Sequence, residues 1–370
     1  MQQERKGKSE LKMYHVSSSP HVKSKLTTKS IMGDVIIALL PPSIFGIINY
    51  QNLFGMEYGI RSALLILLTV AACVISEYIF DLITKRPSTI GDLSAVVTGM
   101  ILALNLPCTF PYWKAMLGGA FAIIIVKQLF GGLGQNFMNP ALGARCFLVL
   151  SFAGNMVAFY PEMYRVVDGV SQATPLTALK AGENVDLLSM FIGTHAGTIG
   201  ETSIIALLLG ALYLVINKII DLRIPITYIV VFSICIMLFN GQTDITFLLK
   251  HLCGGGLIFG AFFMATDYST SPMTKNGRIL FGICLGVLTA IFRTFGNTAE
   301  GVSFAIIFCN LLVPLIEKIT IPKAFGMVKE NHDNFDCSVW FLSCLIADQY
   351  TIDVCDRQNS PVVRLVLFLL

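Results

Sequence analysis

The run Ser62-Ala-Leu-Leu-Ile-Leu-Leu-Thr-Val-Ala-Ala-Cys-Val-Ile-Ser-Glu-Tyr-Ile-Phe-Asp-Leu-Ile83 decides the fold class of this chain. A helix of that length extends about 33 Å, enough to cross the ~30 Å hydrocarbon core of a bilayer. Similar runs recur along the 370 residues, of which 55% are hydrophobic and only 13% charged. Because soluble domains carry about 25% charged residues, the sequence excludes a soluble fold and predicts an all-α polytopic membrane protein.

Ten apolar runs are candidate membrane spans. They cover residues 31–50, 62–83, 92–107, 116–130, 139–157, 199–217, 226–240, 245–266, 279–295 and 300–317. Glycine or proline interrupts several of them, at Asn105-Leu106-Pro107, Asn139-Pro140 and Gly254-Gly255-Gly256. Interrupted spans are typical of broken helices around a buried site, so we expect such a site within the membrane.

Basic residues in the connecting segments indicate the orientation of the spans. With the amino terminus inside the cell, fifteen Lys and Arg residues fall in inner segments and five in outer ones, namely Arg61, Lys114, Arg165, Lys180 and Lys250. Because basic loops favour the cytoplasm, we expect both termini there. Five spans precede the long outer segment and five follow it, which predicts two inverted five-helix halves.

The same features divide the chain into five parts. We expect a cytoplasmic amino-terminal arm (1–30), a first five-helix half (31–157), an extracytoplasmic segment (158–198), a second five-helix half (199–326) and a tail (327–370). The arm is polar and lacks the apolar core of a secretory signal. No role is assigned to the tail.

Composition narrows the chemistry. The formal net charge is only +3, and no basic block is interleaved with aromatic residues, so nucleic acid is not an expected partner. None of the ten cysteines stands in a C-x-x-C pair, so no metal site is predicted. The chain also lacks dinucleotide-binding and Ser-His-Asp signatures, so no residue is expected to be catalytic by itself and redox activity would need a bound cofactor.

Four ionisable residues within the apolar runs are candidates for charge coupling: Asp34, Lys127, Arg145 and Arg293. A charge near the bilayer centre costs several kcal/mol, so function is the first hypothesis for those that lie deep. Each also has a purely structural interpretation. Lys127 and Arg293 occupy matched positions in the two halves, and an anionic ligand or an opposed carboxylate would satisfy both.

Two acidic residues at the end of the second run have a simpler interpretation. Glu77 and Asp81 lie within two helical turns of the basic pair Lys85-Arg86. Snorkelling of their side chains to the interface, or a local ion pair, would account for both.

The outer segment contains the stretch Asp168-Gly169-Val170-Ser171-Gln172-Ala173-Thr174-Pro175-Leu176-Thr177. Asp-Gly followed by hydroxyl side chains is typical of a turn, and Pro175 keeps Thr174 out of the helical region. A turn is therefore one interpretation. The other is that the segment exposes a hydroxyl group in an extended peptide, which is the geometry that a modifying enzyme needs.

Seven short motifs carry a resemblance to a known family. They are Ser18-Ser-Pro-His21, Ile31-Met-Gly-Asp-Val-Ile-Ile-Ala-Leu-Leu-Pro41, Gly91-Asp-Leu-Ser-Ala-Val-Val-Thr-Gly99, Asn139-Pro-Ala-Leu-Gly-Ala-Arg145, Ser171-Gln-Ala-Thr-Pro-Leu176, Gly260-Ala-Phe-Phe-Met-Ala-Thr-Asp267 and Arg293-Thr-Phe-Gly296. Through them the chain resembles, from His15 to Gly326, the RnfD subunits of ion-translocating ferredoxin:NAD oxidoreductase (Rnf) complexes. It resembles more distantly the NqrB subunits of sodium-pumping NADH:quinone reductases.

The resemblance implies a urea-transporter-like arrangement of the two halves and two flavins. In the family, the threonine of a D-G-x-S-x-A-T pattern carries FMN through a phosphoester that a separate flavin transferase forms. Thr174 matches that threonine, although Gln172 stands where the family usually has glycine. The second flavin is a riboflavin held without a covalent bond, and its contacts cannot be predicted from the sequence.

Neighbouring residues suggest why Thr174 would be the acceptor instead of Ser171 or Thr177. Ala173 leaves room beside the hydroxyl, and the following proline holds it away from a helix. Ser171 is placed to hydrogen-bond a phosphate or the turn backbone, while Asp168 and Gly169 shape the turn.

The implied function is that of a membrane flavoprotein subunit, an enzyme component that carries electrons between ferredoxin and NAD while Na⁺ or H⁺ crosses a bacterial inner membrane. Implied partners are a second covalent-FMN subunit, two small membrane subunits and the subunits that interact with NADH and ferredoxin. An NqrB-like quinone-reducing subunit is the first alternative, and a solute transporter or channel the second. The sequence does not distinguish sodium from proton coupling.

Overall fold

The computed structural model describes residues 27–86, 88–160, 175–180, 185–241, 244–296 and 301–322. Every regular element within these ranges is a helix, which confirms the all-α class. The chain divides into two compact units, residues 1–321 and 322–370. Only Pro322 of the second unit is described, so the helices and sites all belong to the first unit.

The helical elements agree with the ten apolar runs, each of which coincides with one element or with directly connected elements. They are α1 (Thr28–Phe54), α2 (Met56–Thr84), η1 (Ile90–Asp92), α3 (Ser94–Leu104), α4 (Tyr112–Phe121), η2 (Ala122–Gln128), α5 (Pro140–Ser151), α6 (Ala153–Met156), α8 (Pro175–Lys180), α9 (Leu187–Ile192), α10 (Ile204–Ile216), α11 (Arg223–Asn240), α12 (Ile245–Cys253), α13 (Leu257–Phe259), η3 (Gly260–Met264), α14 (Lys275–Phe295) and α15 (Val302–Thr320). The segments η2 and η3 are π-helical.

Five helices are long and apolar enough to cross a membrane: α1, α2, α11, α14 and α15. A sixth span results if α12 and the helix from Leu257 to Met264, which meet at a 67° bend, are counted together. The chain is therefore a multi-pass membrane protein. Because α3, α5 and α10 are shorter, the count of ten spans and the inverted halves stay predictions.

Polar caps explain where several helices begin. The side chain of Asn139 accepts a hydrogen bond from the backbone N–H of Ala141, and Pro140 occupies the first position of α5, where its missing N–H costs nothing. Ser203, Asp244 and Thr274 cap α10, α12 and α14 in the same way. The predicted break at Asn139-Pro140 is therefore a helix start.

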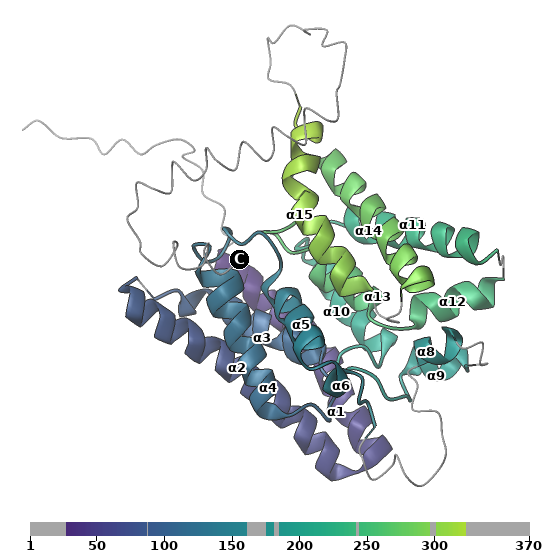
Figure 1. Cartoon of the computed structure of the whole chain (residues 1–370), viewed down its shortest axis with the longest axis horizontal. Coiled ribbons are helices and arrows are strands. Elements are labelled where there is room, and N and C mark those ends of the chain that lie inside the picture. Colours follow the sequence, from purple (N-terminus) through teal and green to yellow (C-terminus); the bar gives the residue numbers. More distant parts are fainter. Residues whose placement is uncertain are drawn as a thin grey trace, which may run out of the picture. The chain divides into compact units, whose positions relative to one another are not determined.

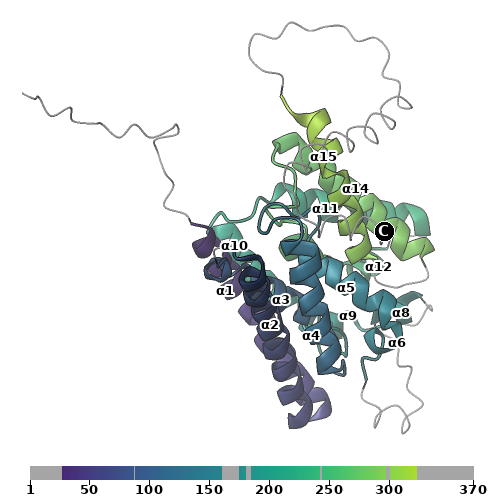
Figure 2. The same ribbon diagram turned by 60° about the vertical axis from the view of Figure 1, so that its left-hand side comes forward.

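The helices from the two parts of the sequence lie in two groups (Figure 1). Helices α1 to α5 lie together on one side, and α11 to α15 on the other. Helix α15 packs directly against α5, and α10 contacts both α1 and α13. Figure 2 shows α10 beside α1 from a second direction. The space between the groups is where residues from both parts of the chain can meet.

Small residues bring neighbouring helices into close contact. A Cβ atom on Gly99 of α3 would lie 2.7 Å from the Cα atom of Val70 on α2. A Cβ atom on Gly286 of α14 would lie 2.8 Å from Val231 Cβ and 2.9 Å from the backbone nitrogen of Phe232, both on α11. Close backbone approach at glycine is typical of membrane helices.

Non-helical backbone is paired in the interior of the molecule. The N–H of Ile199 donates to the carbonyl of Leu106 at 3.0 Å, and the N–H of Gly200 donates to that of Leu104 at 2.8 Å. These bonds satisfy backbone groups just beyond the end of α3, which would otherwise be costly in an apolar environment. The interruption predicted at Asn105-Leu106-Pro107 is thus a place where α3 ends and a distant segment crosses it.

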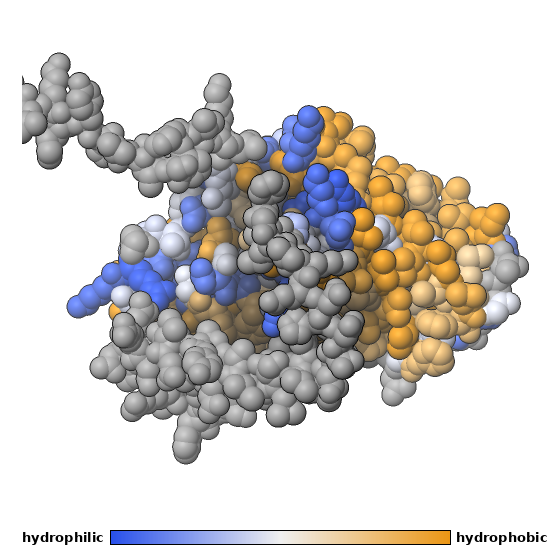
Figure 3. All heavy atoms as spheres, turned by 90° about the horizontal axis from the view of Figure 1, so that it is seen from above, coloured by the Kyte–Doolittle hydropathy of each residue, from blue (hydrophilic) through white to orange (hydrophobic). Residues whose placement is uncertain are grey.

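The outer surface of the spanning helices is apolar. In the most apolar 18-residue stretch of each of α1, α2 and α11, only 28% is buried within the chain. In the view from above, an almost continuous hydrophobic face covers one side of the molecule (Figure 3). Such a large exposed apolar surface requires lipid or other membrane subunits as its environment.

Candidate functional site

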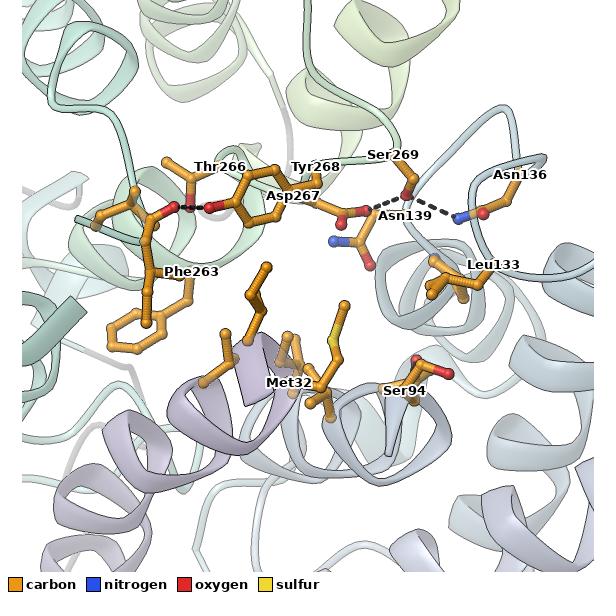
Figure 4. Close-up of a pocket in the computed structure, with 18 of the residues that line it drawn as sticks. Met32, Ser94, Leu133, Asn136, Asn139, Phe263, Thr266, Asp267, Tyr268 and Ser269 are labelled. Carbon is orange, nitrogen blue, oxygen red and sulfur yellow. Dashed lines mark hydrogen bonds between the residues drawn. The ribbon is translucent and has the colours of Figure 1, made fainter. Parts of the chain in front are cut away.

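A pocket between the two groups of helices is the main candidate site. Apolar walls come from α1 and α3 on one side and from η3 on the other, including Met32, Val97, Ile101 and Phe263. Its empty space is about 750 Å³, a volume that includes the part open to solvent. We call it the inner pocket (Figure 4).

Polar side chains gather along one wall of the inner pocket (Figure 4). Ser269 donates to Asp267 Oδ2 at 2.9 Å, and Asn136 Nδ2 donates to Ser269 Oγ at 3.3 Å. Asn139 Nδ2 donates to the carbonyl of Met264 at 3.3 Å. Asn136 is 5% exposed, and its Oδ1 atom has no hydrogen-bond partner among the described residues. An unpaired acceptor atom therefore belongs to a residue that lines the pocket.

Asp267 provides the acidic group of this wall. Its withdrawal from water raises the pKa of its carboxyl above the ordinary value, and hydrogen bonds from Ser269 and Thr270 counteract that shift.

A second cavity adjoins the inner pocket, and we call it the vestibule. The two cavities share Ile219, Ile220, Thr266 and Tyr268 as lining residues. The hydroxyl of Tyr268 donates to the carbonyl of Ile219, which fixes the ring between the cavities. Lys218, Asp221 and Arg278 give the vestibule a polar lining.

Lys127 is one of the four charge-coupling candidates, and it contacts both the inner pocket and a buried carboxylate. Its Nζ atom lies 2.6 Å from Glu77 Oε1 and donates to Ser94 Oγ at 2.8 Å. Lys127 is 2% exposed and Glu77 0%. The hypothesis that an opposed carboxylate satisfies Lys127 is confirmed. The interpretation of Glu77 and Asp81 as interfacial residues is wrong, because both side chains point inward and are buried.

Arg145 lies elsewhere, at the junction of the two groups of helices. Its Nη1 atom donates to Ser303 Oγ on α15 at 2.6 Å and lies 3.8 Å from Glu201 Oε1. A Cβ atom on Gly256 would collide with the Glu201 carboxylate, so that carboxylate packs against the break between α12 and α13. Arg145 thereby links α5 to the second group.

Arg293 caps the bent segment. Its guanidinium group donates to the carbonyls of His251 at 2.5 Å and Gly254 at 2.9 Å, and lies 5.1 Å from the ring centroid of Phe232. Carbonyls at the end of a helix need such partners. Arg293 therefore holds the predicted break at Gly254-Gly255-Gly256 in place. Asp34, the fourth candidate, accepts a hydrogen bond from the hydroxyl of Tyr213 at 3.0 Å and joins α1 to α10.

The proposed flavin-attachment residues, Asp168, Gly169, Ser171, Ala173 and Thr174, lie outside the described residues. The structure resumes at the following residue with α8. Leu176 is 1% exposed, and its Cδ1 atom would lie 3.2 Å from a Cβ atom on Gly254. Lys180 Nζ donates to the carbonyl of Gly296 at 3.0 Å. The segment that follows Thr174 is thus attached to the α12 break and to the end of α14.

Sequence reasoning missed the polar wall of the inner pocket as a site. Asn139 and Asp267 belong to the family motifs, but nothing in one sequence shows that they approach each other from different halves. The spacing of Asn136 and Asn139 was the available signal, since two amides three residues apart at a helix start are unusual for an apolar run. The roles of Glu77 and Thr89 depend on the fold of the connection after α2.

Comparisons with known proteins agree with the motifs. The sequence profile of the NQR2, RnfD, RnfE family matches residues 15–326. The D subunit of the Na⁺-translocating ferredoxin:NAD⁺ oxidoreductase complex of Acetobacterium woodii is 44% identical over 321 residues, which cover 85% of this chain and 96% of that protein.

Two further relatives are similarly covered. The D subunit of the proton-translocating ferredoxin:NAD⁺ oxidoreductase complex of Clostridium ljungdahlii is 38% identical over 85% of this chain and 96% of its own length. The D subunit of the ion-translocating oxidoreductase complex of Salmonella enteritidis is 33% identical over 85% of this chain and 99% of its own length. The family match and these end-to-end similarities establish that the chain belongs to the NQR2, RnfD, RnfE family.

Proposed function

We propose that this chain is the D-type membrane subunit of an ion-translocating ferredoxin:NAD⁺ oxidoreductase of the Rnf type. The observation that carries the proposal is the 44% identity to a subunit of such a complex, across nearly the full length of that subunit. In this role the chain is part of an enzyme. It carries electrons between ferredoxin and NAD⁺ together with the other subunits of the complex, while Na⁺ or H⁺ crosses the bacterial inner membrane.

Riboflavin is the cofactor that we place in the inner pocket. Its isoalloxazine ring needs apolar walls for its faces and polar groups for its pyrimidine edge, and the pocket offers both. The unpartnered Oδ1 atom of Asn136 would accept from a ring N–H group, and Asn139, Ser94 and Lys127 would contact the remaining polar atoms. When bound, riboflavin supplies one- and two-electron chemistry that amino-acid side chains cannot.

Thr174 is the proposed attachment site of FMN, through a phosphoester formed by a flavin transferase. Support comes from the D-G-x-S-x-A-T pattern and from the fixed position of α8, which begins at Pro175. Covalent attachment removes much of the entropic cost of holding a flavin at a membrane surface. Asp168, Gly169, Ser171 and Ala173 would shape the peptide that the transferase recognises.

The length of α14 supports separate locations for the two flavins. Arg278, near one end of α14, lines the vestibule beside the inner pocket. Gly296, just beyond the other end, accepts the hydrogen bond from Lys180 of α8. Because 18 residues of helix extend about 27 Å, the vestibule and the contact of α8 lie near opposite ends of α14, which supports two separate flavin locations. Electrons that visit both flavins would cross most of the membrane.

The topology that suits this role has ten spans in two inverted halves, with both termini in the cytoplasm and Thr174 outside. Support comes from the excess of basic residues in alternate connections. The matched interruptions also support it, since each half contains a short helix that ends in non-helical backbone, at Asn105 and at Gly254.

The proposed function is tested by purifying the complex through a tag on this chain. Reduced ferredoxin should then reduce NAD⁺ in proteoliposomes and build an ion gradient that an ionophore abolishes. An NqrB-like subunit would instead copurify with NADH-dependent quinone reduction and without ferredoxin dependence. A transporter or channel, which the broken helices would also suit, would move solute without any redox substrate.

A further inference from the structure

A buried cluster of polar side chains adjoins the inner pocket, and we call it the acid–lysine cluster. It consists of Glu77 and Asp81 of α2, Thr89 of the following connection, Ser94 of α3, and Lys127 and Gln128 of η2. Apart from half-buried Thr89, each of these side chains is at most 5% exposed. Residues from four parts of the first group of helices therefore converge on one site.

Hydrogen bonds in the cluster are concentrated on two oxygen atoms. Glu77 Oε1 accepts from Lys127 at 2.6 Å, from Thr89 Oγ1 at 2.7 Å and from Gln128 at 3.0 Å. Asp81 Oδ2 accepts from the backbone N–H of Thr89 at 3.0 Å and lies 3.1 Å from Thr89 Oγ1. Because the threonine hydroxyl has a single hydrogen, it cannot donate fully to both carboxylates.

The remaining carboxylate oxygens have no partner. Glu77 Oε2 and Asp81 Oδ1 are both buried and without a hydrogen bond among the described residues. Glu77, Asp81 and Lys127 together carry a net charge of −1 when all three are ionised. A buried anionic oxygen without a donor is costly. The acid–lysine cluster can therefore accommodate one further positive charge.

Lys127 connects this cluster to the inner pocket. Both Lys127 and Ser94 line the pocket while they contact each other within the cluster. Negative charge that accumulates on a pocket ligand attracts the ammonium group and competes with Glu77 for it. The charge compensation that Glu77 and Asp81 receive therefore depends on the charge state of the pocket.

We propose that Asp81 takes up one proton when the occupant of the inner pocket gains an electron, so that the acid–lysine cluster compensates the new charge. The inference rests on the proposed function, which supplies the pocket flavin and an iron–sulfur reductant. One electron passes from that reductant to the occupant, and one proton from water forms an O–H bond on Asp81. The ammonium group of Lys127 then interacts more strongly with the pocket occupant and less strongly with Glu77. The total charge of pocket and cluster is then unchanged.

Asp81 is the acceptor because of the bonds that the two carboxyl groups make. Glu77 Oε1 accepts hydrogen bonds from three residues, whereas Asp81 Oδ2 accepts them only from Thr89. Asp81 also lies closer to solvent, since Arg86 and Ser88 on either side of the connection are exposed. A proton can therefore arrive from the side that is cytoplasmic in the proposed topology.

The surrounding charges and ligands favour a proton over a metal ion. Cys73 interacts electrostatically with both Lys127 and Glu77. Lys85 and Arg86 follow α2 in the chain, and Asp92 belongs to η1. In the described part of the chain, no group of three His, Cys, Asp or Glu side chains could hold a metal. Hard cations take about six oxygen ligands, whereas a proton needs only one acceptor.

Redox-induced infrared difference spectroscopy on the purified complex tests the inference. Reduction should produce the C=O band of a carboxylic acid. Asp81→Asn should remove this band with unchanged flavin content, because the variant leaves Glu77 paired with Lys127. Thr89→Val should keep the band but shift its position, because the hydroxyl that joins the carboxyl groups is gone. Glu57→Gln, an exposed acid on the same helix, is the matched control and should leave the band unchanged.

The outcomes separate this inference from the proposed function. If the pocket flavin is present and reducible but no carboxylic-acid band forms, or if the band persists in Asp81→Asn, the inference is wrong and the proposed function stands. If the complex contains no extractable flavin at all, the proposed role of the pocket is wrong and the inference is overturned with it.

Discussion

Lys127 and Glu77 form a fully buried ion pair, with 2.6 Å between Nζ and Oε1 across 50 positions of sequence. The pair fastens η2 to α2 at the wall of the inner pocket. An ion pair in this position costs desolvation energy, so its presence indicates a role beyond stability. The structure suggests that role, because Lys127 also lines the inner pocket.

Breaking the pair from one side should be strongly destabilising. Lys127→Met leaves the Glu77 carboxylate buried without its cation, and we expect a loss of about 3–5 kcal/mol in the free energy of unfolding. The double variant Lys127→Met/Glu77→Gln removes both charges and should recover a large part of that loss. Thermal denaturation in detergent measures the effect. Equal losses in the single and double variants would show that charge pairing is not the cause.

The contact of α14 with α11 should not tolerate a methyl group. Gly286→Ala forces a Cβ atom against the backbone of Phe232, and overpacking of this kind costs about 1–3 kcal/mol. Gly33→Ala on α1 is the matched control, because nothing lies within 4 Å of its Cβ position. The control should be neutral or slightly stabilising. A denaturation midpoint that falls equally in both variants would contradict the packing argument.

The sequence predicts the helices well and the site poorly, for physical reasons. Apolar runs and Gly or Pro interruptions depend on local chemistry, so the positions of α1, α2, α11 and the break after Cys253 could be anticipated. The partner of Lys127 could not, because it depends on the left-handed residues Lys85 and Leu93, which fold the connection after α2 back over Glu77. The hydropathy of the sequence does not predict the backbone path of this connection.

The polar wall of the inner pocket should determine flavin retention. Asn136→Leu removes the buried Oδ1 acceptor and the bond to Ser269, so the complex should lose most of its acid-extractable riboflavin while keeping covalent flavin. Gln135→Leu, at the exposed neighbouring position, should retain it. Chromatography of extracted flavins measures the ratio. Full riboflavin retention in Asn136→Leu would place the riboflavin elsewhere.

The orientation of the chain is tested by a reporter fused after Tyr160, the last described residue before the attachment segment. Periplasmic alkaline phosphatase fused there should be active, and a fusion after Lys218 should be inactive, because basic connections favour the cytoplasm. The opposite pattern would invert the topology. It would place the Thr174 segment inside the cell.

The central claim is that this chain carries two flavins in an electron-transferring complex. The direct measurement is flavin content per copy of the chain, with denaturing-gel fluorescence for the covalent flavin and peptide mass mapping for its site. We predict one FMN on Thr174 and one extractable riboflavin, with the fluorescent band lost in Thr174→Val and partly kept in Thr174→Ser. A fluorescent band that persists in Thr174→Val, or a complex that transfers electrons without any flavin on this chain, would contradict the account.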